Sequence, residues 1–219
     1  MGDAENIADQ DLIDALHPLI EDGKARHDMA HAAACLCDGL GAQRLLAVLD
    51  PPEANDGAAV HLRPAVAADA ERLLAWQRDP RTRRHFRVSR VPSAREHQTW
   101  FAERLMNPEC LFHIVMHNGE CAGVLRLEWC AGDGSYDVSI YVAPERWRLG
   151  IGGVALSLAR NLLPQAEFQA EVREGNEASH ALFAAAGYHQ VGSNPEVSRY
   201  VSRPGAEMAP PQAPKEAVQ

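Results

Sequence analysis

Three glycines occur within four residues at a point where an apolar pattern of helical spacing begins. They are Gly150, Gly152 and Gly153, and apolar residues recur from Ile151 onward. Glycine lets a backbone approach a ligand closely because it has no side chain. The first N–H groups of a helix and the positive end of its dipole favour a bound phosphate. The pattern therefore predicts a diphosphate-binding loop over residues 145–153, with a tight helix entry as the alternative; it matches neither a P-loop nor a dinucleotide fingerprint.

Seven arginines lie between residues 78 and 95, and Asp79 is the only acidic residue in that stretch. Guanidinium groups match phosphate oxygens, so this run predicts a surface for an anionic substrate such as a nucleotide diphosphate. A solvated arginine-rich loop is the other interpretation. Nucleic acid is not an expected partner, because residues 61–219 carry 18 acidic and 18 basic side chains and lack interleaved aromatic residues. The candidates for substrate binding are Arg78, Arg83 and Arg84.

The elements that must position these groups follow from capping and turn signals. Ser93 and Glu96 fit a capping box and predict a helix over residues 94–106. The pair Asn118-Gly119 suits a two-residue hairpin turn between apolar strands. The other segments complete an α+β pattern, with helices after Gly150 and Asn176 and strands at 111–117, 120–129, 135–142, 167–173, 188–192 and 197–202.

Alternation along the strand at 120–129 assigns its two faces. Leu125 and Leu127 share one face, and Arg126 and Glu128 share the other. An arginine and a glutamate are therefore expected side by side on one surface of the sheet.

Composition and charge divide the chain into four parts. The N-terminal part is acidic, since residues 1–60 hold 12 acidic and 3 basic side chains. Proline, glycine and small residues mark a linker, and a proline- and alanine-rich end predicts a disordered tail. The parts are a helical segment at 1–49, the linker at 50–58, the main domain at 59–203 and the tail at 204–219.

No apolar run approaches the roughly 20 residues that a membrane-spanning helix needs, and the acidic start does not resemble a secretory signal. Five cysteines without CxxC spacing predict reduced thiols. We therefore expect a cytoplasmic protein without membrane association. His27 and His31 lie one helical turn apart, but no third ligand accompanies them, so no metal site is expected.

Two motifs resemble those of the GCN5-related N-acetyltransferase (GNAT) superfamily. The loop after the third predicted strand is similar to the family motif Q/R-x-x-G-x-G/A through Gly150 and Gly152, with Trp147 in the Q/R position. Residues 176–188 are similar to the second motif, N-x-x-S-x-x-x-F-x-x-x-G-[FY]. The resemblance covers residues 59–202 and implies the GNAT fold, a mixed and mostly antiparallel sheet flanked by helices.

The resemblance implies acetyl-coenzyme A as cosubstrate, bound where the strand at 135–142 diverges from the strand at 167–173. The pantetheine arm would pair with the backbone of the first of these strands. The N–H of Val142 would face the thioester oxygen and act as a one-bond oxyanion hole. For Asn176, helix capping is the competing interpretation. The residues implied in cofactor binding are Tyr141, Val142, Arg148, Gly150, Ile151, Gly152, Gly153, Asn176 and Ser179.

An acceptor amine must be neutral when it attacks, and members of the family often carry a carboxylate that removes its proton through water. Glu128 matches that position, and its alternative role is an ion pair with Arg126. Asp137 and Tyr141 are weaker candidates. Phe183 stands where many relatives have a tyrosine that protonates the leaving thiolate. That proton would then come from Ser179, Tyr136, Tyr188 or water.

Several short motifs resemble the branch of the superfamily that acetylates a UDP-linked 4-amino-4,6-dideoxy sugar in pseudaminic acid synthesis. Residues 10–49 resemble the C-terminal tail of the UDP-sugar hydrolase of that pathway. The resemblance implies an amino-sugar nucleotide as acceptor, and it leaves a homodimer and a fusion with, or docking to, such a hydrolase open. The acetyltransferase motifs are Leu62-Arg63-Pro64-Ala65, Arg78-Asp79-Pro80 and His97-Gln98-Thr99-Trp100-Phe101.

Two other functions stay open at this point. Similar motifs occur in ribosomal-protein acetyltransferases, so the acceptor could be a protein N-terminus. A non-catalytic module that binds acetyl-coenzyme A and docks partners through the acidic N-terminal helices is the third reading.

Overall fold

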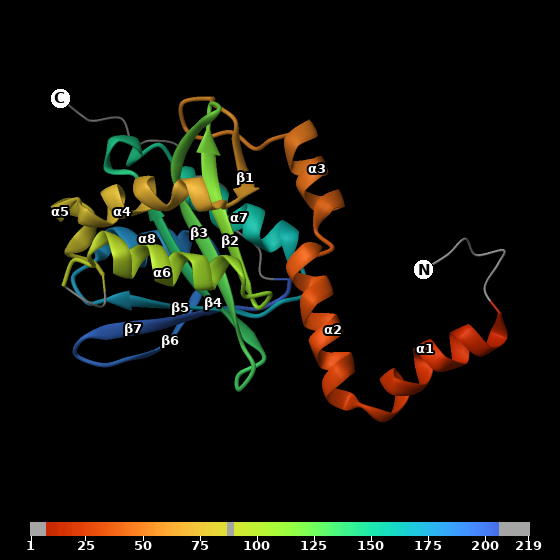
Figure 1. Cartoon of the computed structure of the whole chain (residues 1–219). Helices are drawn as coiled ribbons and strands as arrows, with labels where there is room; N and C mark the ends of the chain where they lie inside the picture. Colours follow the sequence, from red (N-terminus) through yellow and green to blue (C-terminus); the bar gives the residue numbers. More distant parts are fainter. Residues whose placement is uncertain (1–7, 87–89, 206–219) are drawn as a thin grey trace, which may run out of the picture. The chain divides into compact units, whose positions relative to one another are not determined.

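The computed structural model describes residues 8–86 and 90–205, apart from the side chain of Cys35. Its contacts divide the chain into two compact units, 1–39 and 40–219, which Figure 1 shows in sequence colours. None of the described helices is long and apolar enough to cross a lipid bilayer. Most of the predicted tail, from residue 206 onward, lies outside the described residues.

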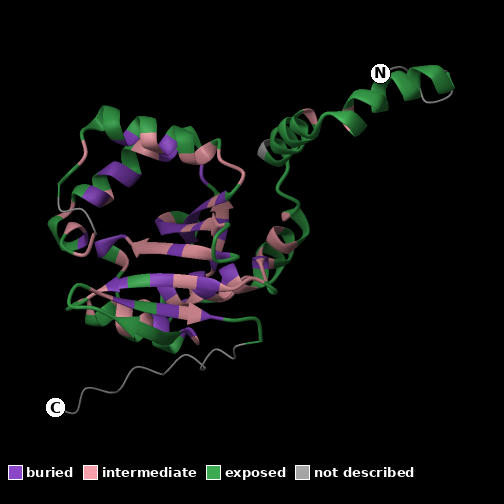
Figure 2. Ribbon diagram, turned by 90° about the horizontal axis from the view of Figure 1, so that it is seen from below, coloured by how far each residue is buried: buried purple, intermediate pink, exposed green. Residues whose placement is uncertain are grey.

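The first unit consists, in its described part, of two helices, α1 (Asp9–Glu21) and α2 (Gly23–Leu36). Asp22 separates them, because its side chain accepts hydrogen bonds from the N–H groups of Lys24 and Ala25 in the first turn of α2. Figure 2 shows both helices almost entirely exposed. The predicted N-terminal helices are confirmed, and the break between them at Asp22 was not predicted.

The second unit is built on a seven-stranded sheet in the order β1-β2-β3-β4-β5-β7-β6. Every neighbouring pair is antiparallel except β4 and β5, which are parallel. The predicted mixed, mostly antiparallel sheet is therefore confirmed. The strands are β1 (Val60–Pro64), β2 (Cys110–His117), β3 (Glu120–Cys130), β4 (Ser135–Val142), β5 (Phe168–Arg173), β6 (His189–Ser193) and β7 (Val197–Ser202).

Helices cover both faces of this sheet. One buried cluster joins α7 (Ile151–Leu162) and α8 (Glu177–Ala185) to one face, and a second joins α4 (Ala70–Arg78) and α6 (Ala94–Leu105) to the other. Burying the apolar face of each element against the sheet is the main source of stability in such a layered fold. The other helical segments are α3 (Gly41–Leu49), α5 (Pro80–Arg83) and the short turns η2 (Ala67–Asp69) and η3 (Pro144–Arg146).

Local signals in the sequence place the elements correctly. Ser93 Oγ accepts from the Glu96 N–H, and the Glu96 carboxylate accepts from the Ser93 N–H, so the capping box opens α6 as predicted. Asn118 and Gly119 have φ angles of 50° and 77°, which suit the tight turn between β2 and β3. Leu125 is fully buried on the face covered by α7, which confirms the faces assigned to β3.

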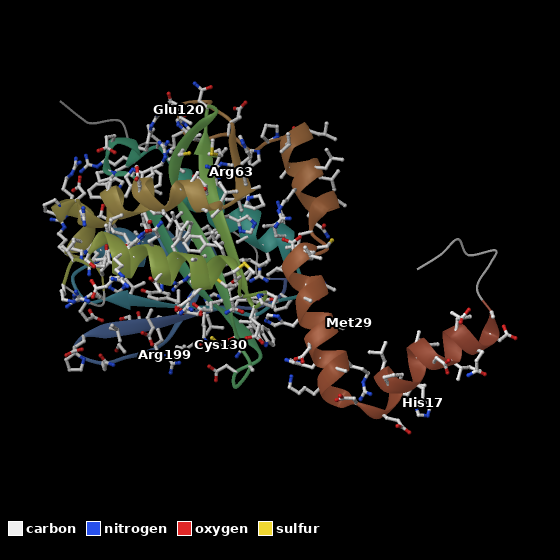
Figure 3. All side chains as sticks on the ribbon, viewed as in Figure 1. His17, Met29, Arg63, Glu120, Cys130 and Arg199 are labelled. Carbon is white, nitrogen blue, oxygen red and sulfur yellow. The ribbon has the colours of Figure 1, made fainter. Side chains whose placement is uncertain are left out.

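An ion pair fixes the start of α4, the helix that leads toward the candidate site. Arg63, labelled in Figure 3, donates hydrogen bonds from both terminal nitrogens to the two Asp69 oxygens, at 2.8 and 2.6 Å. Burial of Asp69 by itself would raise its pKa, but the hydrogen bonds from Arg63 and the Val66 N–H outweigh that cost and lower it. This buried carboxylate is therefore held ionised beneath α4.

The division into units differs from the predicted boundary at residue 49. It falls after Gly39, because α3 packs on β1 and α7. The stretch 50–58, interpreted as a linker, contains most of a hairpin over residues 53–59, in which Glu53 pairs with Ala59 and Ala54 is buried. Linkers and tight turns share a composition rich in proline, glycine and small residues, so composition alone does not separate them.

Candidate functional site

Strands β4 and β5 pair over only two positions before they diverge. Tyr136 lies opposite Phe168 and Asp137 opposite Gln169, whereas β4 continues to Val142 and β5 to Arg173. We call the space between the diverging ends the β4–β5 wedge. The register thus confirms the predicted divergence of these strands.

Backbone alternation determines which groups of β4 face this wedge. The Tyr136 N–H donates to the Glu167 carbonyl on the β5 side, at 2.9 Å, and the Ala143 N–H donates to the Ala122 carbonyl on the β3 side, at 2.7 Å. Successive N–H groups of a strand point to opposite sides. The N–H groups of Ile140 and Val142 therefore point toward the wedge.

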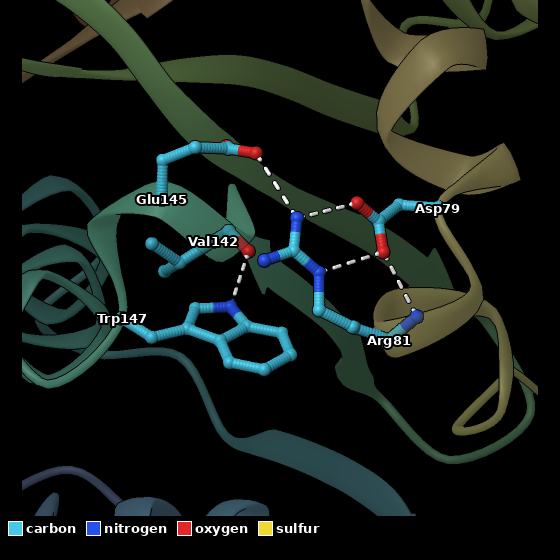
Figure 4. A network of polar contacts seen from close by, with 5 residues as sticks. All are labelled: Asp79, Arg81, Val142, Glu145 and Trp147. Atoms are coloured by element: carbon cyan, nitrogen blue, oxygen red, sulfur yellow. Dashed lines mark hydrogen bonds and ion pairs between the residues drawn. The ribbon is translucent and has the colours of Figure 1, made fainter.

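The loop from β4 to α7 covers one end of the wedge. The indole Nε1–H of Trp147 donates to the Val142 carbonyl at 2.8 Å (Figure 4). Arg148 and Gly150 both have left-handed φ angles, 67° and 76°, and α7 begins directly after Gly150. Backbone turns of this kind gather N–H groups into a concave anion site at a helix N-terminus. The Arg148 side chain is exposed beside it.

The three glycines of this loop differ in how much space a side chain would have. A Cβ at Gly150 would lie 2.6 Å from Oδ1 of Asn55, and its φ angle also disfavours a side chain. A Cβ at Gly152 would lie 3.2 Å from Leu182 of α8, so this glycine brings α7 close to α8. At Gly153 a Cβ would meet nothing within 4 Å. Packing within the chain thus explains the glycines at 150 and 152, whereas at Gly153 no described neighbour requires one.

Helix α8 begins just beyond the end of β5. The Asn176 side chain accepts from the Ser179 N–H at 3.3 Å, so Asn176 caps this helix. Ser179 is half-buried. Phe183 is buried in the core and its ring centroid lies 5.0 Å from that of Tyr188, whose pKa is raised by burial. The tyrosine candidate on this side of the wedge is therefore a core residue.

Glu128 lies on the sheet face beneath α6, between two arginines. Its carboxylate oxygens are 3.4 Å from Nε of Arg104 and 3.6 Å from Nε of Arg126. Neither Nε makes a hydrogen bond within the described part of the chain, so these contacts are ion pairs without directional bonding. Asp137 lies directly across from Glu128 on β4. The expected neighbours Arg126 and Glu128 are thus brought together, and Glu128 keeps lone pairs available for a proton or a water.

Helix α4 and the segment that joins it to α6 contact Tyr141 of β4 on the same face of the sheet as Glu128. The rings of Trp76 and Phe86 lie 6.3 and 5.8 Å from that of Tyr141 on β4. The Arg173 side chain, at the end of β5, donates to the Phe86 carbonyl at 2.9 Å. Burial raises the pKa of Tyr141. Aromatic rings therefore enclose Tyr141 and bring the arginine-rich segment to the ends of both diverging strands.

The arginines of this segment are not equivalent. Arg81 binds Asp79 and also reaches Glu145 at 3.2 Å (Figure 4). Glu145 belongs to the loop between β4 and α7, residues 143–150, which we call the donor loop. Arg83 lies over the Phe86 ring and donates to the Arg90 carbonyl, and burial lowers its pKa.

Two of the three predicted substrate arginines are exposed. Arg78 and Arg84 have no carboxylate partner within residues 8–86 and 90–205, and Nε of Arg84 donates to His85. Arg83, the third, is held by its neighbours. Arg87 of the predicted run lies outside the described residues. The free positive charge of the segment is thus smaller than its seven arginines suggest.

Several residues of the site were not singled out from the sequence. Asn55 contacts the donor loop, and Arg173 and Phe86 join the ends of the segment described above. Each depends on a contact between distant parts of the chain, which no local pattern signals. Only the Asn55-Asp56-Gly57 run carries a local signal, that of a turn.

The sequence matches one family model, described as an acetyltransferase (GNAT) domain, over residues 59–189. No curated protein matches the sequence.

Many solved structures share the fold. A ribosomal L7/L12 alpha-N-protein acetyltransferase in complex with coenzyme A is 15% identical, with a TM-score of 0.58, over 68% of this chain and 96% of that one. A chimera of the spermidine N-acetyltransferase SpeG from Vibrio cholerae and hSSAT is 16% identical, with a TM-score of 0.56, over 66% and 95%. The microcin C7 self-immunity acetyltransferase MccE in complex with acetyl-CoA and AMP is 13% identical, with a TM-score of 0.57, over 66% and 92%.

Proposed function

The chain belongs to the GNAT acetyltransferase family, and from this we propose that it transfers an acetyl group to an amine. Its acyl donor is acetyl-coenzyme A. We infer that the acceptor is the amine of a nucleotide-linked amino sugar. The short pairing of β4 with β5 supports the donor site most directly, because it leaves the Val142 N–H directed into the wedge. The finer assignment, to a UDP-linked 4-amino-4,6-dideoxy sugar of pseudaminic acid synthesis, rests on the sequence resemblance.

The donor side would hold its ligand mainly with backbone groups. N–H groups of Arg148, Gly150, Gly152 and Gly153 would bind the pyrophosphate at the start of α7, and the Arg148 guanidinium would add charge. Ile151, between these glycines, is buried and anchors the helix in the core. Asn176 and Ser179, at the start of α8, would border the cofactor on the other side.

The chemical step would use two groups of this chain. The Val142 N–H would donate to the thioester oxygen as negative charge develops there, which stabilises the transition state in a dry cleft. Glu128 lies opposite Asp137, five positions along β3 from the residue that pairs with Val142, so it would accept a proton from the acceptor amine through a chain of waters. The nitrogen lone pair then attacks the carbonyl carbon while the carbon–sulfur bond breaks. Because Phe183 cannot donate a proton, Ser179 or water would protonate the thiolate.

The acceptor side would bind an anion. Arg78 and Arg84 are exposed and have no carboxylate partner among the described residues, and their segment contacts Tyr141 of β4 through Trp76 and Phe86. Guanidinium groups in this position suit a diphosphate. MccE, which has the same fold, was crystallised with acetyl-CoA and AMP, which supports a nucleotide-bearing acceptor. A cationic peptide or polyamine would be repelled by the same arginines.

The test incubates the full chain with acetyl-coenzyme A and a panel of amines, with mass spectrometry of the products and detection of released thiol. The panel holds a UDP-4-amino-4,6-dideoxy sugar, other nucleotide-linked amino sugars, peptides with free N-termini and spermidine. We expect acetylation of a nucleotide-linked sugar. Acetylation of peptides alone would replace the acceptor assignment with protein N-terminal acetylation. Binding of coenzyme A without thiol release for any amine would favour the non-catalytic module.

A further inference from the structure

A short hairpin that precedes β1 contacts the donor loop from outside the sheet. Glu53 pairs with Ala59, the Ala54 N–H donates to the Ala58 carbonyl at 2.9 Å, and Gly57 has a left-handed φ of 77°. Ala54 is buried in the cluster that includes α7. We call residues 53–59 the N-terminal hairpin. Because both of its strands are hydrogen-bonded and its second residue is buried, the hairpin is a fixed part of the second unit.

The third residue of the hairpin touches three consecutive residues of the donor loop. The Asn55 N–H donates to the Leu149 carbonyl at 2.8 Å, and Asn55 Nδ2 donates to the Arg148 carbonyl at 3.4 Å. Its side-chain oxygen fills the place that a Cβ at Gly150 would take. A left-handed φ at a residue other than glycine costs of order 1 kcal/mol and persists only where surrounding contacts hold it. Asn55 supplies such contacts on both sides of Leu149, next to the left-handed Arg148.

The next hairpin residue contacts the opposite end of the same loop through a histidine. His117, buried at the end of β2, has Nε2 3.1 Å from Asp56 Oδ1 and Nδ1 3.2 Å from Nη1 of Arg146. A guanidinium only donates hydrogen bonds, so Nδ1 accepts and the ring proton is on Nε2, facing Asp56. The hydrogen bond from His117 lowers the pKa of Asp56. Arg146 also pairs with Glu120, labelled in Figure 3 at the start of β3.

We propose that the N-terminal hairpin sets the geometry of the pyrophosphate loop, with Asn55 and Asp56 as positioning residues for the donor. Asn55 holds the carbonyls of Arg148 and Leu149 in place. The N–H groups that follow are thereby oriented toward the ligand. Asp56 acts through His117 on Arg146, where the loop leaves β4. The proposal rests on the proposed function, because it concerns the same donor site. Neither residue touches the reacting atoms.

This arrangement also separates the two arginines of the loop. Arg146 is committed to Glu120 and His117, whereas Arg148 is exposed. Fixing the first arginine between two protein groups leaves the second as the loop's cation for phosphate. The hairpin should therefore affect affinity for the pyrophosphate end of coenzyme A, and not the backbone pairing of β4 with the pantetheine arm.

The first experiment compares Asn55→Ala with the wild type by calorimetry with coenzyme A. We expect about tenfold weaker binding, which corresponds to the loss of one hydrogen bond and its packing contact. Asn194→Ala is the matched control, because Asn194 makes similar turn hydrogen bonds, to Glu196 and Val197, in the loop between β6 and β7. That control should leave coenzyme A affinity unchanged.

Asp56 allows a rescue test. Asp56→Ala removes the acceptor for His117 Nε2–H and should weaken coenzyme A binding, whereas Asp56→Asn keeps an oxygen that accepts from both His117 and the Ala58 N–H. We therefore expect Asp56→Asn to bind within about twofold of the wild type, since a hydrogen bond rather than a charge does the positioning. Equal losses in Asp56→Asn and Asp56→Ala would contradict this step.

Hydrogen exchange separates positioning from general stability. In the wild type, coenzyme A should slow exchange of the N–H groups of residues 148–153 and of Ile140 and Val142. In Asn55→Ala, protection at 148–153 should fall while protection in β4 remains. Unchanged affinity in Asn55→Ala, or an equal loss of protection in β4 with a lowered unfolding temperature, would overturn the inference. Failure of the wild type to bind coenzyme A would instead overturn the proposed function.

Discussion

The two sides of β4 present different chemical groups: backbone N–H groups on one side and charged side chains on the other. Toward β5, the wedge offers backbone N–H groups and a glycine loop. The conformation of that loop depends on positions 150 and 152 having no side chain. Toward α4 and α6, the same strand faces Glu128, Arg126 and an arginine-rich segment, and its chemistry depends on which charges pair with one another. The first side should be sensitive to the size of a substituted residue and the second to its charge.

The largest expected effect is on the charged side. Glu128→Gln removes the proposed base while keeping shape, so we expect kcat to fall by roughly 10²-fold or more with coenzyme A affinity unchanged. Steady-state kinetics and calorimetry measure the two quantities. Asp137→Asn, across from Glu128 on β4, is the matched control. Full activity in Glu128→Gln would remove this residue from the mechanism, and a loss confined to Asp137→Asn would move the role to Asp137.

The backbone side is tested by adding a single methyl group. Gly150→Ala places a Cβ 2.6 Å from Asn55 at a left-handed φ, so we expect coenzyme A to bind about 10- to 100-fold more weakly, from strain of order 1–3 kcal/mol. Gly153→Ala, whose Cβ would meet nothing within 4 Å, should change affinity much less. Calorimetry decides. Equal effects at both glycines would indicate that ligand contact, and not loop geometry, dominates.

A smaller effect is expected in the arginine-rich segment of residues 78–95. Arg78→Ala should raise the acceptor KM about tenfold, by loss of one charge-assisted contact to phosphate, and leave the donor KM unchanged. Arg95→Ala, which removes an exposed charge from the same arginine run, is the control. The effect should shrink as salt is added, because exposed charges are screened. Identical acceptor KM values for both variants would remove the phosphate-binding role.

Prediction from sequence succeeded where the signal was local. The capping box at Ser93, the Asn118-Gly119 turn and the alternation along β3 each depend on neighbouring residues, and the structure confirms them. The glycine loop was also found this way, because glycines at a helix start are a local pattern. The wedge followed from the family resemblance and agrees with the register of β4 and β5.

Prediction was weaker where contacts join distant parts of the chain. The sequence shows that seven arginines lie close together. It does not show that Arg81 contacts Glu145 or that Arg83 lies over the Phe86 ring, because these contacts form only in the folded chain. The hairpin around Asn55 resembled a linker in composition, because the loop that it contacts is distant in sequence: Arg148 lies 93 residues after Asn55. Local composition carries no information on such contacts.

The smallest expected effect concerns α6, the helix above the charged side. Hydrogen bonds from Arg90 and the Ser93 N–H lower the pKa of Glu96 from 4.5 to about 2. A carboxyl with a lowered folded pKa stabilises the protein above its unfolded pKa and loses that contribution as pH falls through the folded value. Glu96→Gln should therefore lower the unfolding temperature slightly at pH 6, and the difference should vanish between pH 4.5 and about 2.

The size of this shift is limited because both side chains of the pair are exposed. Glu103→Gln removes an exposed charge from the same helix outside the capping box, so it controls for net charge. Thermal unfolding at several pH values, with calorimetry for coenzyme A at pH 6, gives both readouts. Since α6 lies on the charged side of β4, Glu96→Gln should leave coenzyme A affinity unchanged. A loss of affinity would mean that the two sides of β4 are coupled, and that the contrast between backbone and charge does not hold.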